Sequence, residues 1–319
     1  MNKPFFIITI DTEGDNLWQN SQQITTKNTH YLPRFQALCE KYGFKPVYLT
    51  NYEMASDPAY VEFARDVIRR GQGEVGMHLH AWNNPPLQPL TRDDLVHKPY
   101  LIEYPQDVMR AKVDVMTKLL EDNFQTKMLS HRAGRWAFNS FYAQLLVEYG
   151  YQVDCSVTPH VDWRGAKGNP HGQGGTDYRH FPAHAYFMDL THIERAGDSR
   201  LLEVPMSTCL KHPSWYNVLK GGYDRLRGKR RAPSVSWVRP RGGNSAEMQR
   251  VAKKYLSQGS DYVEFMLHSS EFMPGGSPTF KTKQDIEQLY RDLEETFAWL
   301  AQRTQGATLA EYYQYKAAR

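Results

Sequence analysis

The chain has 319 residues, of which 40% are hydrophobic and 13% aromatic, and its formal net charge is +4. This composition supplies ample apolar material for a buried core and excludes an intrinsically disordered chain. The charge is too small to indicate a dedicated nucleic-acid-binding protein. The three cysteines are widely separated and form no C-x-x-C pair, which argues against a disulfide framework or a thiolate zinc site.

Membrane and export signals are not apparent in the sequence. No run approaches the roughly 18 apolar residues of a membrane span. The apolar run at residues 5–10 is too short for a signal peptide. We therefore expect a soluble cytoplasmic protein with no transmembrane segment.

The first half of the chain alternates short apolar runs with helical patterns. The runs predict strands at 5–10, 45–50, 74–78, 126–130 and 152–157, and the helical patterns cover 31–42, 57–70, 106–122 and 140–149. Such alternation is typical of βαβ units, which build a parallel sheet, so the expected class is α/β.

The second half is less regular. Residues 158–200 are rich in Gly, Pro, His and aromatic residues, and we expect a loop-rich insertion there, followed by a basic loop around 220–243. Further strands are predicted at 201–205 and 262–267, and helices at 245–257, 282–303 and 308–315. Because no internal repeat or linker is found, we predict a single domain over 1–319.

Polar side chains follow several predicted strands at the points where the strands end. They form four clusters, namely Asp11/Glu13/Asp15, His78/His80, His131/Arg132/Arg135 and His268/Glu271. The C-terminal ends of parallel strands face one mouth of a barrel, so we expect these clusters to converge. A carboxylate and two imidazoles suit Zn²⁺ or a similar divalent ion that keeps a position open for water.

The order of the clusters resembles the polysaccharide deacetylases of the NodB-homology type, carbohydrate esterase family 4. The similar segments are, in order, Thr9-Ile10-Asp11-Thr12-Glu13, Gly73-Glu74-Val75-Gly76-Met77-His78-Leu79-His80, Ser130-His131-Arg132-Ala133-Gly134-Arg135-Trp136 and Phe265-Met266-Leu267-His268. The resemblance runs from Ile7 to about Pro278 and is weakest over 158–200. It implies a distorted (β/α)7-type barrel and a metal-dependent hydrolase that removes an N-acyl group, first of all acetyl, from an amino sugar.

The resemblance also implies roles for individual residues. Asp11 is the general base, Arg132 orients that base, and His268 is the general acid. Glu13 and His78 are metal ligands, with zinc as the expected ion and cobalt or nickel as alternatives. The implied substrate is an N-acylated amino sugar that is nucleotide-linked, lipid-linked or polymeric, and no nucleic acid is expected as a partner.

The histidine motif departs from the usual family pattern, which places a second histidine four residues after the first. This chain has Trp82 there, within a His-Leu-His-x-Trp segment followed by paired prolines. In an extended segment His80 faces the same way as His78, so we predict that it is the third ligand, with Asp15 as the alternative. If Trp82 marks a broken site, the chain is a catalytically inactive carbohydrate-binding relative. A hydrolase of small non-sugar amides is a further alternative, because the same metal chemistry serves it.

The remaining polar residues are given mainly structural interpretations. His131 is expected to be structural, and Arg135 to form a salt bridge to a helix in preference to binding substrate. Asp154 is a weak candidate for an acid that tunes the catalytic histidine. The basic stretch 225–231, continued by Arg239 and Arg241, is interpreted as a solvated loop, with a phosphate cradle as the alternative.

Overall fold

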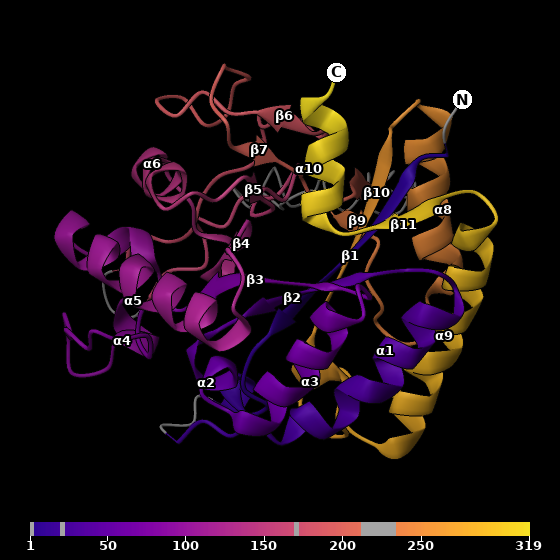
Figure 1. Ribbon diagram of the computed structural model, residues 1–319, viewed down its shortest axis with the longest axis horizontal. Helices are drawn as coiled ribbons and strands as arrows, with labels where there is room; N and C mark the ends of the chain where they lie inside the picture. The colour runs from indigo at the N-terminus through magenta and orange to yellow at the C-terminus, as the bar shows by residue number, and fades with distance from the viewer. Residues whose placement is uncertain (1–2, 20–22, 169–171, 212–233) are drawn as a thin grey trace, which may run out of the picture.

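A curled, mainly parallel sheet forms the centre of the molecule in the computed structural model, which describes residues 3–19, 23–168, 172–211 and 234–319 (Figure 1). The strands are β1 (Phe5–Thr12), β2 (Pro46–Thr50), β3 (Glu74–Leu79), β4 (Ser130–Ala133), β5 (Val153–Asp154), β6 (Tyr186–Phe187), β7 (Leu202–Glu203), β8 (Thr208–Leu210), β9 (Val235–Trp237), β10 (Tyr262–His268) and β11 (Gln305–Ala307). The sheet order is β10-β1-β2-β3-β4-β5-β7-β6, and β11 also pairs with β1. Only β6 runs antiparallel to its neighbour in this sheet.

The sheet forms a half-barrel, because no backbone ladder among the described residues joins β10 to β6 or β7. Side-chain bonds cross this gap instead, with the hydroxyl of Tyr262 donating to the carbonyl of Pro205 and Ser207 Oγ accepting from the amide of Glu264. The α/β class and the distorted barrel architecture predicted from the sequence are confirmed.

Helices connect the strands, as the alternating pattern predicted. They are α1 (Leu32–Lys41), α2 (Tyr52–Ala55), α3 (Pro58–Arg69), α4 (Asp94–His97), α5 (Gln106–Phe124), α6 (Ser140–Glu148), α8 (Ser245–Ser257), α9 (Lys283–Ala301) and α10 (Leu309–Ala317). Local sequence explains where helices begin and end. At α3 the Asp57 side chain accepts from the amide of Ala59 at the N-terminus, and the chain turns away at Gly71, whose φ is +64°.

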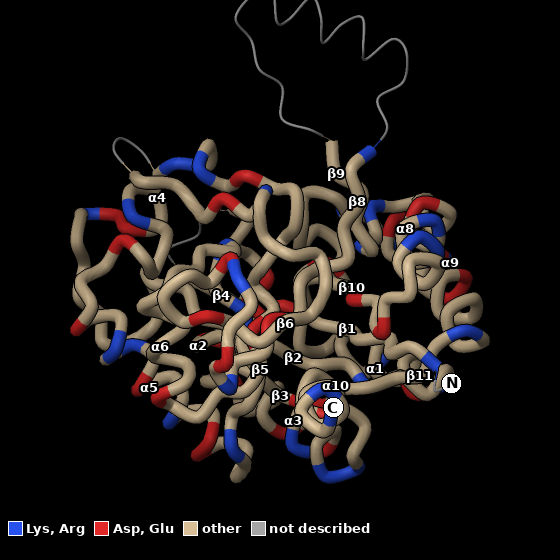
Figure 2. Tube along the Cα trace, turned by 90° about the horizontal axis from the view of Figure 1, so that it is seen from above, with Lys and Arg blue, Asp and Glu red and all other residues tan. Residues whose placement is uncertain are grey.

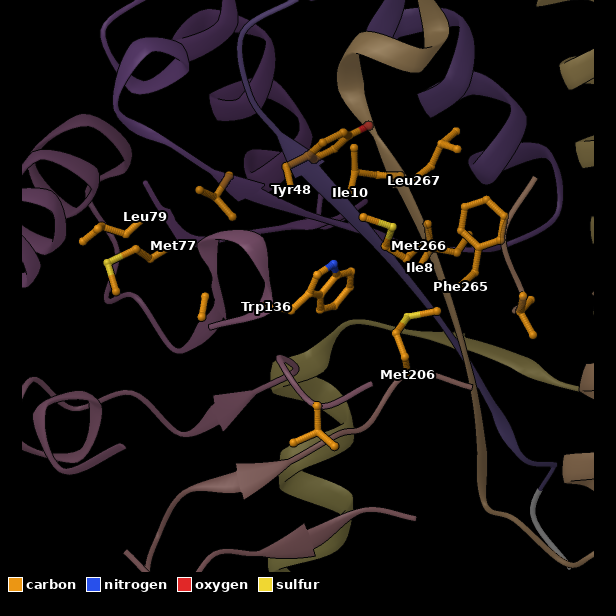
Figure 3. Packing of buried hydrophobic residues seen from close by; sticks show 14 of the residues in the cluster. Ile8, Ile10, Tyr48, Met77, Leu79, Trp136, Met206, Phe265, Met266 and Leu267 are labelled. Atoms are coloured by element: carbon orange, nitrogen blue, oxygen red, sulfur yellow. The ribbon is translucent and has the colours of Figure 1, made fainter. Parts of the chain in front are cut away.

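Alternate residues of each central strand face opposite sides of the sheet. Phe6, Ile8 and Ile10 of β1 belong to a large cluster with the buried faces of the outer helices. Figure 3 shows Ile8 and Ile10 beside residues of β10 in this cluster. One face of β1 thus packs on the outer helices, which leaves its other face for the barrel interior.

The interior changes from apolar to polar along the strands. Ile7 and Tyr262 pack in a second cluster with Leu309 and Tyr312 of α10, which lies beside β1 and β10 (Figure 1). Two residues further along β1 the same face carries Thr9, and then Asp11. The apolar end is therefore closed by α10, and the polar residues gather toward the C-terminal ends of the strands.

Several sequence predictions need correction. The strand predicted at 126–130 begins only at Ser130, because pairing with β3, which sets His131 opposite Met77, determines where β4 forms. The predicted strand 152–157 is reduced to the two residues of β5. Most of 158–200 is irregular, as expected, although it contains β6. The basic loop expected around 220–243 contains β9, and its residues up to 233 lie outside the described part of the chain.

Surface charges of both signs are interspersed along the trace (Figure 2). Several of them pair between elements, as in Arg34 with Glu287 and Arg70 with Glu40. Within the described ranges, no helix has the length and apolar character needed to cross a membrane.

Candidate active site

A cavity of about 410 Å³ opens at the C-terminal ends of the central strands. Its lining combines acids, histidines, arginines and a wall rich in aromatic rings, contributed by Asp11, Glu13, Leu17, Trp18, His78, His80, Trp82, Leu95, Tyr100, Arg135, Trp136, Trp163, Ala166, Arg239 and His268. The structure therefore brings five of the six predicted site residues to one cavity, and the sixth, Arg132, lies directly beneath it. The aromatic residues from the loops, such as Trp18, Tyr100 and Trp163, were not identified from the sequence.

Glu13, His78 and His80 form a buried group whose ligand atoms all lie within 4.8 Å of one another. Nε2 of His80 is 3.4 Å from Glu13 Oε2, and Nε2 of His78 is 3.7 Å from the same oxygen. Ligand atoms bound at about 2.1 Å around a tetrahedral ion lie about 3.4 Å apart. The donor set and its spacing therefore fit a divalent ion such as zinc.

The imidazole of His78 is held in an orientation suited to a ligand. Its Nδ1 lies 2.9 Å from the carbonyl oxygen of Arg132, which accepts its proton, so Nε2 is left with a lone pair toward Glu13. Burial acts to lower the pKa of His78, but the carboxylates of Asp11 and Glu13 outweigh it and raise that pKa. This attraction for positive charge is what a cation-binding position provides.

His80 is buried and lies flat against Trp82, with ring centroids 4.5 Å apart and an angle of 22° between the planes. Burial, followed by the cationic neighbours His78 and Arg135, lowers the pKa of His80 well below its ordinary value. The imidazole is therefore neutral, which is the form that binds a metal. Trp82, at the position of the usual second histidine, packs against this ring.

Asp15 lies apart from this group. Its carboxylate accepts from the hydroxyl of Thr25 at 2.5 Å and from the amide of Asn28 at 3.3 Å. These bonds tie the segment after β1 to the 3-10 helix at Lys27–Tyr31. The structure thus gives Asp15 a structural position and does not place it among the potential ligands.

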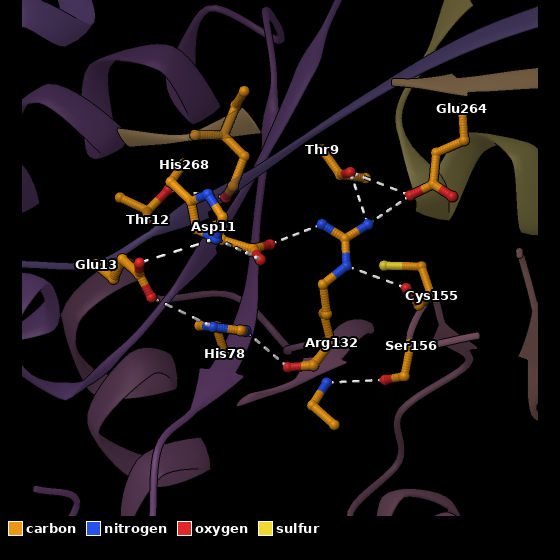
Figure 4. A network of polar contacts seen from close by, with 12 residues as sticks. Thr9, Asp11, Thr12, Glu13, His78, Arg132, Cys155, Ser156, Glu264 and His268 are labelled. Atoms are coloured by element: carbon orange, nitrogen blue, oxygen red, sulfur yellow. Dashed lines mark hydrogen bonds and ion pairs between the residues drawn. The ribbon is translucent and has the colours of Figure 1, made fainter. Parts of the chain in front are cut away.

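Arg132 is fully buried and spans the barrel interior (Figure 4). Its Nη1 donates to Asp11 Oδ1 at 2.6 Å, and its Nη2 donates to Glu264 Oε1 at 2.6 Å. A third bond runs from Nε to the carbonyl oxygen of Cys155. Burial acts to raise the pKa of Asp11, but Arg132, followed by the two nearby histidines, outweighs it and lowers that pKa. Asp11 is therefore ionised and fixed in orientation.

His268 faces the same acids from β10. Its Nε2 is 3.8 Å from Asp11 Oδ2 and 3.9 Å from Glu13 Oε1. Its Nδ1 lies 3.0 Å from Oε2 of Glu271, which also accepts from Arg239. Burial acts to raise the pKa of Glu271, but Arg239 and His268 outweigh it and lower that pKa to about 2. Nη2 of Arg239 also lies 3.0 Å from Nδ1 of His268, so Glu271 and Arg239 together fix the ring, and its Nε2 faces Asp11 and Glu13.

Asp154 does not contact His268. It accepts from Nδ1 of His131 at 2.6 Å, while Nε2 of His131 lies 2.7 Å from the hydroxyl of Tyr142. Both residues are fully buried, so this pair has a structural position, as predicted for His131. The acid that hydrogen-bonds to His268 is Glu271. It lies three residues further along the chain, and this short spacing could have identified it from the sequence.

Arg135 departs from its prediction. The expected salt bridge to a helix is wrong, because no acid in the described chain lies within ion-pair distance of its guanidinium. The group lies instead over the ring of Trp82, 5.1 Å from its centroid, on the cavity wall. Arg239, which the sequence placed in a solvated loop, also lines the cavity.

Comparison with solved structures shows the fold of the chain. A candidate polysaccharide deacetylase from Mycobacterium smegmatis matches 99% of this chain and 92% of its own, with a TM-score of 0.54 and 14% identity. A candidate glycoside hydrolase/deacetylase from Parabacteroides distasonis matches 98% of this chain and 71% of its own, with a TM-score of 0.63 and 9% identity. The 4-alpha-glucanotransferase from Thermococcus litoralis has a TM-score of 0.55 and 13% identity, over 99% of this chain and 41% of its own. No family model and no curated protein sequence matches the chain.

Proposed function

Since the chain has the fold of the polysaccharide deacetylases, we propose that it is a metal-dependent hydrolase that removes an N-acyl group, first of all acetyl, from an amino sugar. One observation carries the proposal. Asp11 and His268 lie beside a buried carboxylate–imidazole–imidazole group, in a single cavity with an aromatic wall. A general base, a general acid and a cation site are thus present within reach of one bound amide.

The metal would be held by Glu13, His78 and His80, with zinc as the first candidate and cobalt or nickel as alternatives. A divalent ion in such a site acts as a Lewis acid on the acyl carbonyl and lowers the pKa of water. Asp11 then accepts the proton of the attacking water, and Arg132 keeps the Asp11 carboxylate ionised and oriented.

His268 completes the reaction on the leaving-group side. When water has added to the carbonyl carbon and the C–N bond breaks, the departing nitrogen must take up a proton, because an amide anion is a very poor leaving group. Nε2 of His268 faces the cavity and donates that proton, while the carboxylate of Glu271 stabilises the imidazolium. The products are a carboxylate and a free amine on the sugar.

The cavity wall supports a sugar substrate. Trp18, Trp82, Tyr100, Trp136 and Trp163 all line it, and Trp18 is 46% exposed. Aromatic rings at the surface of a pocket present flat apolar faces that pack against sugar rings. This aromatic lining favours an amino sugar over a small amide as the substrate class.

Elemental analysis of the purified protein tests the metal site. We expect about one divalent ion per chain, lost in a His78→Ala/His80→Ala variant. The matched control is His184→Ala/His192→Ala, which removes two exposed histidines that do not line the cavity and should keep the ion. Release of free amine is then measured on a panel of N-acetylated amino sugars.

Three results would contradict the proposal. If no ion binds after incubation with zinc, cobalt or nickel, and sugars bind without turnover, the chain is a non-catalytic carbohydrate-binding protein. If an ion binds but only small non-sugar amides are hydrolysed, the substrate class is wrong. If both histidine variants keep the ion, the ligand set is wrong.

A further inference from the structure

Three arginines contribute to the cavity or its floor, and two of them have acidic partners. Arg132 pairs with Asp11 and Glu264, and Arg239 pairs with Glu271 at 3.0 Å. Within the described residues, Arg135 pairs with no acid, yet its side chain lines the cavity. An arginine side chain offers five N–H donors in a fixed planar fork. Arg135 interacts with the hydroxyl of Tyr100, and the rest of its fork is available to a ligand in the cavity.

The backbone at Arg135 adopts a conformation that is costly for this residue type. Arg135 has φ +54° and the next residue, Trp136, has φ +60°. Non-glycine residues in this left-handed region are disfavoured by about 1–2 kcal/mol each. Strained residues of this kind gather at ligand sites, where the surrounding structure imposes them. Here the turn after β4 carries the side chain of Arg135 to the cavity wall.

The guanidinium is held in place by aromatic contacts. It lies 5.1 Å from the centroid of Trp82, the same indole that stacks on His80. Contact with an aromatic face restricts the plane of the guanidinium and leaves its edge free for hydrogen bonds. Arg135 and the potential ligand His80 therefore contact the same indole ring.

The charges of the site are unbalanced when Arg135 is included. Arg132 has Asp11 and Glu264 as acidic partners, and Arg239 has Glu271. One positive charge, that of Arg135, has no acidic partner among the described residues, and its side chain is exposed at the cavity wall. A negatively charged ligand would offset it.

We propose that Arg135 determines specificity by binding an anionic group of the substrate, so that the acylated amino sugar carries a carboxylate or a phosphate. This inference rests on the proposed function for the identity of the sugar. A planar guanidinium forms paired hydrogen bonds with either group, because both carry two oxygen atoms that can accept side by side. The cavity is small for a ligand pocket, which places the anion on the acylated sugar or on its immediate substituent.

Calorimetric binding to four probes tests the proposal. The neutral probe is N-acetylglucosamine, the phosphate probes are its 1-phosphate and 6-phosphate, and the carboxylate probe is N-acetylmuramic acid. Each is titrated into zinc-loaded and into chelator-treated protein. At least one anionic probe should bind about 10-fold or more tightly than the neutral one in both forms. Comparison of the phosphate and carboxylate arms identifies the group.

Arg135→Gln should remove this preference, with a loss of about 10-fold or more for the anionic probe and less than about 2-fold for the neutral one. Arg135→Lys keeps the charge without the fork and should fall between the two. Arg69→Gln, at an exposed arginine of α3, matches the change in net charge and should alter no binding constant. An unchanged thermal midpoint shows that each variant is folded.

The inference is overturned if all four probes bind alike, or if the preference survives in Arg135→Gln. It is also overturned if the preference disappears in chelator-treated protein, since the anion then binds the metal. Turnover of neutral sugars that Arg135→Gln leaves unchanged would remove this inference and leave the proposed function intact. Conversely, Arg135-dependent anion binding by a protein that holds no metal would remove the proposed function alone.

Discussion

Oε2 of Glu271 lies 3.0 Å from both the backbone nitrogen and Nδ1 of His268, so one carboxylate oxygen fixes the position and the ring orientation of the histidine. The same oxygen accepts from Arg239. His268 is therefore oriented by a residue three positions further along its own turn, together with Arg239, whose Nη2 lies 3.0 Å from Nδ1 of His268.

The pH dependence of folding should show the ionisation of Glu271. Its pKa is lowered from 4.5 to about 2 in the folded protein. Its ionised form therefore stabilises the fold above pH about 4.5, and this stabilisation is lost as the pH falls through 2. A shift of this size corresponds to about 3 kcal/mol.

Urea unfolding of metal-free protein between pH 6 and 3 should show a stability difference between wild type and Glu271→Gln that shrinks toward low pH. Glu62→Gln, at an exposed position of α3, should change stability by less than about 0.5 kcal/mol at every pH.

Substitutions at Asp11 and at His78 should distinguish the loss of catalysis from the loss of metal binding. Asp11→Asn keeps the shape of the side chain but cannot accept the proton of water, so we expect metal to be retained and turnover to fall by about 100-fold or more. His78→Ala removes a ligand and should lose both. Metal content and amine release, measured on the same samples, check this. Full activity in either variant would exclude that residue from the site.

Gly134 should be required for the position of His80. A Cβ atom built at Gly134 would collide with the carbonyl oxygen of Leu79 and lie 2.5 Å from Cδ2 of His80. The collision with Leu79 forces the turn after β4 away from β3, and the contact with Cδ2 displaces the imidazole. We expect Gly134→Ala to weaken zinc binding by about 10-fold or more, as measured by competition with a chelating dye.

A matched control for this substitution is Gly165→Ala, where a Cβ atom meets nothing within 4 Å. Zinc affinity should be unchanged there. Equal zinc affinity in the two alanine variants would mean that the turn after β4 relaxes without disturbing the ligand, and that His80 is not held by this contact.

Trp82 should strengthen zinc binding through its contact with the His80 ring. The stacked indole restricts the imidazole, so Trp82→Ala should weaken zinc binding by about 10-fold, whereas Trp82→Phe keeps a flat face and should weaken it less. The two variants are compared by zinc titration. An equal loss in both would point to the indole nitrogen rather than to stacking.

The sequence predicted the parts of the fold that depend on local pattern. The capping aspartate and following proline locate α3, and the helix predicted at 245–257 coincides with α8. The placement of β4 was wrong because strand ends depend on the partner strand, which a single segment does not reveal. The short β5 shows the same effect.

The candidate site divides in the same way. Residues at or just after the C-terminal ends of strands, such as Glu13, His78 and His268, were predicted to converge because parallel strands end at one mouth of the barrel. Glu264 was missed because an acid within an apolar strand shows its purpose only when Arg132 is known to lie opposite. Tyr100 and Trp163 come from irregular segments, where no period reports which way a side chain faces.

The position of Arg132 has a consequence for the order in which the protein can assemble. Asp11 precedes it by 121 residues, and Glu264 follows it by 132. During synthesis, the chain up to β4 would contain a buried arginine and only one of its two acids. Until then Arg132 lacks its bond to Glu264, and a buried arginine with unsatisfied donors is costly, so we expect the interior to stay open to water until β10 emerges and pairs with β1. The cavity and its candidate ligands would then form together, as a late and cooperative step, once residues from both ends of the chain have met.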